Sequence, residues 1–73
     1  MVAKVLFVTC TNAPAGYLLS FNETTNALEL IPIKTEAKTF ADDTAARTQR
    51  TTLMRAQTSD GRHVVLSVHI QDA

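Results

Sequence analysis

Apolar residues fall at strand-like spacing at the start of the chain. Over residues 2–9, Val5 and Phe7 would point to one face of a strand, and Leu6 and Val8 to the other. Apolar side chains on both faces are typical of a central strand. We therefore expect this segment to be a central strand, or a strand whose second apolar face is shielded by a partner.

A second strand is predicted over residues 17–22, after a turn at residues 11–16. The turn contains asparagine, proline and glycine, which all favour turns. Within the strand, the alternation of side chains predicts that Tyr17, Leu19 and Phe21 share one face.

A third strand is predicted over residues 28–33, with Leu28 and Leu30 on one face. Pro32 has no backbone N–H to donate to a neighbour, so this strand is expected to lie at an edge or to end there. Because short links favour antiparallel neighbours, the three strands are expected to form a meander.

A helix is predicted after a charged connector at residues 34–38. Asp42 is the expected N-cap, and the negative charge of Asp43 suits the first turn of a helix. A start one turn earlier, at Thr39, also fits the pattern. One side of this helix is expected to face the sheet through Ala41, Ala45, Ala46, Gln49 and Leu53.

The end of this helix is less well defined, because its second half is rich in β-branched threonines. We expect it to end at Thr51 or Thr52, which gives a length of about 10 residues. The alternative extends the next strand backwards from Leu53 to Arg50.

A hairpin is predicted at the end of the chain. The segments 53–58 and 62–70 flank an Asp-Gly turn, which is a strong hairpin signal. In the last strand, the alternation puts Val64, Leu66, Val68 and Ile70 on a buried face and Val65, Ser67 and His69 on a wetter face.

These elements predict an α+β fold in a single domain over residues 1–73. The expected order is β-β-β-α-β-β. One short helix would pack on one face of a curved antiparallel sheet of four to five strands.

Charge and cysteine content narrow the class of protein. Seven Lys and Arg balance seven Asp and Glu, so the chain has no overall field that attracts nucleic acid or an anionic membrane. No apolar run approaches the roughly 20 residues of a spanning helix, and the first residues do not resemble a signal peptide. The single cysteine, Cys10, is interpreted as a small core residue, and the expected location is the cytoplasm.

No constellation of catalytic or metal-binding residues stands out. His63 and His69 are six residues apart on one predicted strand, or about 20 Å, which is too far for one metal ion. Ser67 and His69 lack an orienting third group, and a pair of acidic residues at 42–43 is explained by the helix start. We therefore predict a protein that is not an enzyme and that has no metal or other cofactor.

One local charge excess is the candidate binding site. Four arginines occur within 16 residues, opposed there by a single acidic residue. Arginine is enriched at protein interfaces, so these side chains are predicted to contact a protein partner. Nucleic-acid binding and plain solvated surface are the alternatives, and paired sheet edges could form a homodimer. The four residues are Arg47, Arg50, Arg55 and Arg62.

The segment Ala37-Lys38-Thr39-Phe40-Ala41-Asp42-Asp43-Thr44-Ala45-Ala46 carries a resemblance. Its Ala-x-x-Phe element, followed by a short acidic-capped helix, resembles a layout of small phage and prophage accessory proteins, including some anti-CRISPR proteins. The resemblance implies a phage-encoded, non-catalytic inhibitor in the cytoplasm of a bacterial host, which occupies a surface of a larger bacterial complex.

The predicted function is therefore that of a small binding protein that inhibits or modulates a partner complex by occupying its surface. Two alternatives remain at this point. They are a nucleic-acid-binding regulator, and a structural homo-oligomer of a phage particle.

Overall fold

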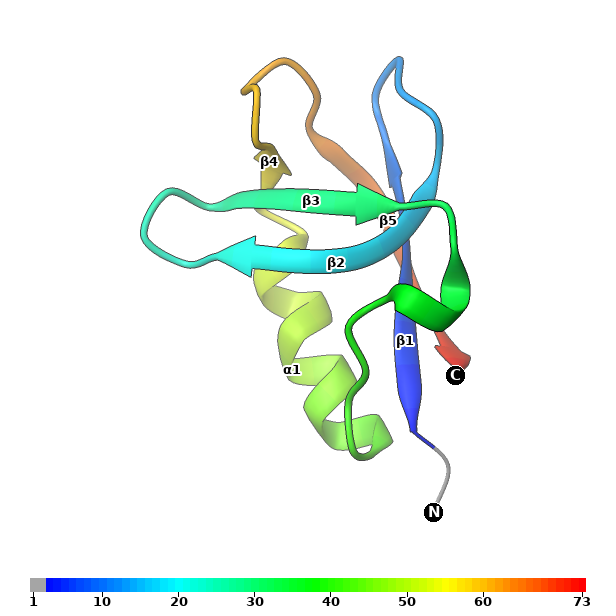
Figure 1. Cartoon of the computed structure of the whole chain (residues 1–73). Coiled ribbons are helices and arrows are strands. Elements are labelled where there is room, and N and C mark those ends of the chain that lie inside the picture. The colour runs from blue at the N-terminus through cyan, green and yellow to red at the C-terminus, as the bar shows by residue number, and fades with distance from the viewer. Residues whose placement is uncertain (1–2) are drawn as a thin grey trace.

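Within residues 3–73, five strands form one curled sheet, and a single α-helix packs on one side of it (Figure 1). The structure, a computed structural model, describes residues 3–73. The predicted α+β class and the order of its strands and helix are confirmed. The elements are β1 (Lys4–Cys10), β2 (Gly16–Asn22), β3 (Ala27–Ile31), the 3-10 helix η1 (Lys34–Glu36), α1 (Asp43–Leu53), β4 (Gln57–Thr58) and β5 (Val65–Asp72).

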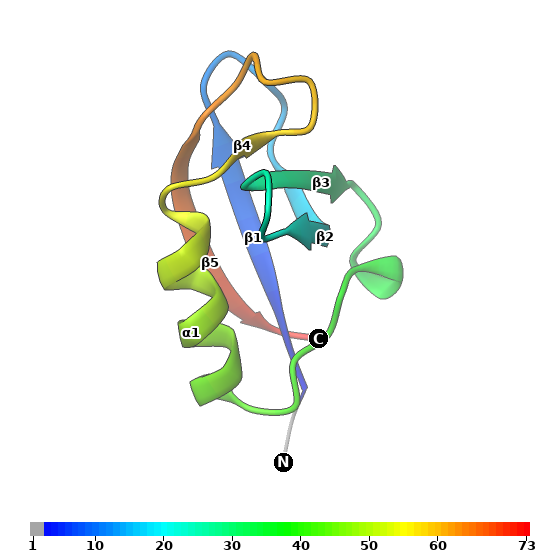
Figure 2. The ribbon, with the colours of Figure 1, turned by 90° about the vertical axis from the view of Figure 1, so that its left-hand side faces the viewer.

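The strand order in the sheet is β4-β3-β2-β1-β5. β1 is central, between β2 and β5, as its two apolar faces predict. All pairs are antiparallel except β3 with β4, which is parallel and was not expected. A bridge between Gln57 and Val64 joins β4 to the start of β5, so the two ends of the sheet meet at this point. The sheet consequently curls around its own core (Figure 2).

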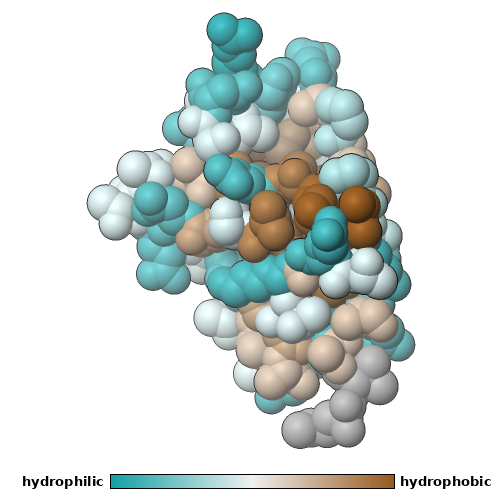
Figure 3. Space-filling view, viewed as in Figure 1, coloured by the Kyte–Doolittle hydropathy of each residue, from teal (hydrophilic) through white to brown (hydrophobic). Residues whose placement is uncertain are grey.

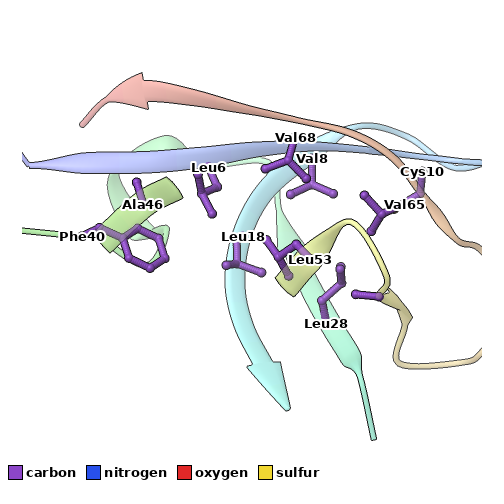
Figure 4. Close-up of a cluster of buried hydrophobic side chains, with 11 residues drawn as sticks. Leu6, Val8, Cys10, Leu18, Leu28, Phe40, Ala46, Leu53, Val65 and Val68 are labelled. Atoms are coloured by element: carbon purple, nitrogen blue, oxygen red, sulfur yellow. The ribbon is translucent and has the colours of Figure 1, made fainter. Parts of the chain in front are cut away.

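The core lies between α1 and the concave side of the sheet. Leu6 and Val8 of β1 meet Leu18 of β2 and Leu53 of α1 there, and all four are fully buried (Figure 4). Ala46 is also fully buried, which lets α1 approach the sheet closely. The complete cluster comprises Leu6, Val8, Cys10, Leu18, Leu28, Phe40, Ala46, Leu53, Ala56, Val65 and Val68.

A β-bulge in β2 overturns the expected face of that strand. The register with β3 shifts between Leu18 and Ser20, so Leu19 is the extra residue. Leu18 and Phe21 therefore both turn towards the core, while Tyr17 lies on the opposite face. The prediction that Tyr17, Leu19 and Phe21 share one face is wrong for this reason.

A second bulge, in β5, overturns the expected alternation of the last strand. Thr9 pairs with Ser67, whereas Cys10 pairs with Val65, which leaves Leu66 as the extra residue. Leu66 is 56% exposed, and Val65 is buried instead. The predicted buried face is wrong at its start, where Val64 is also exposed.

The start of α1 is as predicted. Asp42 is the N-cap, and its Oδ1 accepts a hydrogen bond of 2.8 Å from the N–H of Ala45. The sheet-facing side is narrower than expected, because Ala46 and Leu53 are buried whereas Ala41 and Ala45 are exposed.

The helix ends at Leu53, one or two residues later than predicted, so the alternative of an extended segment here is wrong. Three threonine hydroxyls donate to the carbonyl oxygen four residues earlier, which accommodates these β-branched residues in a helix. They belong to Thr48, Thr51 and Thr52.

The C-terminal hairpin is shorter than predicted. Leu53 belongs to α1, and β4 has only two residues. The Asp-Gly turn is present, with Gly61 at φ +74°, a left-handed conformation that favours glycine. β3 ends at Ile31, immediately before Pro32, as predicted.

Candidate protein-binding surface

Four strands contribute one row of side chains to the outer face of the sheet, opposite the helix. Ile31 of β3 is paired with Tyr17 of β2, Tyr17 with Phe7 of β1, and Phe7 with His69 of β5. Their neighbours along each strand point to the core, so alternation places this row outside. His69 is exposed and the other three are half-buried.

The two aromatic rings in this row are packed on each other. The ring centroids of Phe7 and Tyr17 are 5.1 Å apart, with an interplanar angle of 65°, which is an edge-to-face contact. Such pairs add stability beyond the area they bury. The rings are therefore held in place by each other.

Two exposed apolar side chains extend the row. Leu19 is 39% exposed and lies two residues beyond Tyr17, and Ile33 is 50% exposed and lies two residues beyond Ile31. Apolar side chains gather in a band across β2 and β3 in Figure 3. We call Phe7, Tyr17, Leu19, Ile31 and Ile33 the outer-face patch.

One border of the outer-face patch is fixed by the connector between β3 and α1. Lys38 N–H donates to Leu18 C=O at 2.8 Å, and Lys4 and Phe40 exchange two backbone hydrogen bonds of 2.8 Å. Val5, which shares a face of β1 with Phe7, is fully buried. The patch is therefore presented by strands and by a connector that is tied to them.

The sequence did not identify this patch. The second apolar face of β1 was visible in the pattern, because Phe7 stands among alternating apolar residues. The alignment with Tyr17 and Ile31 depends on the register of three strands, and the exposure of Leu19 depends on a bulge.

The structure separates the four arginines into different places. Arg47 and Arg50 lie on α1, where Arg47 Nε is 2.7 Å from Asp43 Oδ2 and Arg50 is half-buried. Arg55 follows the helix and lines a depression beside the β2–β3 turn, and Arg62 lies in the loop before β5. Their role in binding a partner stays a prediction.

The histidines are also apart. His63 is fixed in the loop before β5, where its Nδ1 is 2.6 Å from the carbonyl oxygen of Thr11. Since a carbonyl only accepts, Nδ1 is the donor in this hydrogen bond. His69 lies on β5 instead, where it is paired with Phe7 on the outer face of the sheet.

Cys10 and the acidic pair at the helix start have structural roles. Cys10 is 3% exposed, and burial raises the pKa of its thiol. Asp42 caps α1 and Asp43 pairs with Arg47. Within residues 3–73 no group of three His, Cys, Asp or Glu side chains is placed to hold a metal ion.

Comparisons with protein-family models, with curated proteins and with solved structures find no match. No helix in the described part of the chain is long and apolar enough to cross a membrane.

Proposed function

We propose that the protein is a non-catalytic binding protein that modulates a protein partner by occupying its surface through the outer-face patch. The observation that carries this proposal is the row of Ile31, Tyr17 and Phe7 across three neighbouring strands, with exposed Leu19 and Ile33 beside it. Apolar and aromatic side chains held on rigid strands are typical of the centres of protein interfaces.

The chemistry of the patch favours a protein over a nucleic acid. None of its five side chains is charged, and the chain as a whole has net charge zero. Phe7 and Tyr17 meet edge to face, so they do not present two parallel platforms on which bases could stack. Within this proposal, the resemblance carried by residues 37–46 adds a larger bacterial complex as the class of partner and inhibition as the effect.

The test uses immobilised protein and a bacterial lysate, with bound proteins identified by mass spectrometry. The double variant Leu19→Glu with Ile33→Glu places charge on the patch at positions that are already exposed. Val64→Glu is the matched control, because Val64 is 51% exposed and lies outside the patch. We expect a partner that both wild type and control capture and that the double variant loses.

Salt provides a second readout. Apolar contacts are not screened by ions, so capture should persist at high salt. The proposal fails if the double variant retains the same partner, or if the wild type captures nothing specific. A gel shift with mixed-sequence DNA or RNA that disappears as salt is raised would favour the nucleic-acid alternative instead.

A further inference from the structure

The C-terminal part of β5 presents an unpaired edge. The start of β5 is tied to the β4 segment, because Val65 N–H donates to Ala56 C=O, whereas residues 67–71 pair with β1 alone. Ala73 N–H donates to Ala3 C=O at 2.8 Å, so this pair of residues is of the hydrogen-bonded kind. Hydrogen-bonded and non-hydrogen-bonded pairs alternate along antiparallel strands, so Ile70 and Val68 both belong to non-hydrogen-bonded pairs with β1. Their N–H and C=O groups therefore point away from β1.

Beyond the bulge at Leu66, the outer side of β5 has no backbone partner in the described chain. Among residues 3–73, neither Val68 nor Ile70 makes a backbone hydrogen bond on the outer side. Residues 67–71, beyond the bulge, contain no charged side chain and no proline, which are two of the usual means of protecting an edge. The edge can therefore accept an extended peptide through backbone pairing.

One flank of α1 lies next to the C-terminal end of β5. Asp72 of β5, which pairs with Lys4, and Asp43 of α1 both raise the pKa of Lys4, so Asp43 lies near this end of β5. Asp43 forms an ion pair with Arg47, so the flank that carries these two residues is on the β5 side of α1, where the helix packs against this strand. Figure 2 shows the helix alongside β5.

This flank carries positive charge. Arg47 and Arg50 are three residues apart on α1, so their side chains lie on the same flank. Asp43 balances one of them through its ion pair with Arg47. Within the described chain Arg50 makes no ion pair, which leaves a net positive charge beside the free edge.

We propose that the β5 edge binds an extended acidic peptide segment of a protein partner. Backbone pairing with Val68 and Ile70 would supply the affinity. Every second side chain of the added strand would point to the side of the sheet where α1 lies, so an acidic residue there would face Arg47 and Arg50. A second copy of this chain fits less well, because pairing two β5 edges brings two sets of these arginines together.

The test measures the fluorescence polarisation of dye-labelled octapeptides in low salt. The probe alternates glutamate and valine, and its controls replace glutamate with lysine or carry an N-methyl group on every residue. We expect binding of the acidic probe alone, because the lysine peptide meets like charge and the N-methylated peptide has lost its donors. In amide hydrogen exchange, Val68 and Ile70 should become protected when the acidic probe is added.

Two double variants distinguish the effect of the arginines on this flank from the effect of the net charge of the protein. Arg47→Gln with Arg50→Gln should weaken binding about fivefold, as expected for two exposed ion pairs. Arg55→Gln with Arg62→Gln removes the same charge elsewhere and should leave binding unchanged. The patch variant Leu19→Glu with Ile33→Glu should also bind normally, so this proposal and the proposed function can fail separately.

Three results would overturn the proposal. They are an acidic probe that does not bind, equal weakening by the two arginine pairs, and binding without protection of Val68 and Ile70. Sedimentation that shows a dimer, with both amides protected in the absence of peptide, would assign the edge to a second copy.

Discussion

Val65 and Val68 turn into the same core although they are three residues apart on one strand. An unbroken strand would place them on opposite faces. The bulge at Leu66 inserts the extra residue that brings both valines to the inner side, and it leaves Leu66 outside.

The first prediction follows from this bulge. Val68→Ala should lower the free energy of unfolding by about 2 kcal/mol, because it removes buried methyl groups from a packed core. Leu66→Thr should change it by less than about 0.5 kcal/mol, because the side chain is exposed. Urea denaturation measures both, and a larger loss from Leu66→Thr would contradict the assignment of the bulge.

The cap of α1 gives the second prediction. Asp42→Ala should cost about 1 kcal/mol of unfolding free energy, because the N–H of Ala45 loses its acceptor. Asp42→Asn keeps a side-chain oxygen at the same position and should retain most of the stability. Thermal melts of the two variants would contradict the role of the cap if both lost the same amount.

Gln49 gives the third prediction. Its Nε2 atom is buried, and no hydrogen-bond partner for it exists among the described residues. An unpaired buried donor is unfavourable, so Gln49→Met, which has a similar volume, should raise the free energy of unfolding by about 1 kcal/mol. Gln49→Glu should lower it, because a charge would be buried at this position. A stabilising Gln49→Glu would contradict the burial of this group.

Acid stability gives the fourth prediction. The Thr58 hydroxyl and the Arg62 N–H donate to Asp60, and both lower the pKa of its carboxyl from the ordinary 3.8. Hydrogen bonding and charge from Lys4 lower the pKa of Asp72 in the same way. Folding therefore favours the charged form of both carboxyls. Their contribution to the free energy of unfolding is complete above pH 3.8, and it is lost as pH falls through the lower pKa values of the folded state.

The measurement is unfolding free energy as a function of pH below neutrality. Asp60→Asn and Asp72→Asn should each make its decline in acid less steep. Glu23→Gln is the control, because Glu23 lies in an exposed turn. An acid profile that neither aspartate variant changes would show that these contacts contribute nothing in solution.

Local signals in the sequence predicted the local parts of the fold. The cap at Asp42, the Asp-Gly turn and the end of β3 just before Pro32 each depend on the chemistry of one or two residues, and all are present. The fold class followed from the order of these elements. The threonines near the end of α1 were the exception, because their side chains find acceptors within the helix.

The missed features depend on contacts between distant segments. A period of two cannot locate the extra residue of a bulge, so the outward turn of Leu19 and Leu66 was not predictable. The parallel pairing of β4 with β3 joins segments on either side of the helix. The candidate surface depends on both kinds of contact, because the alignment of Phe7 with Tyr17 is set by register.

The central position of β1 has a consequence for synthesis on the ribosome. β1 precedes the other four strands of the sheet in the chain, yet one of its two neighbours, β5, is the last of the five. Until Asp72 has been synthesised and can meet Lys4, one side of β1 has no strand to pair with. The pairing of β1 with β5 is therefore the step of sheet formation that requires the longest stretch of chain to be available.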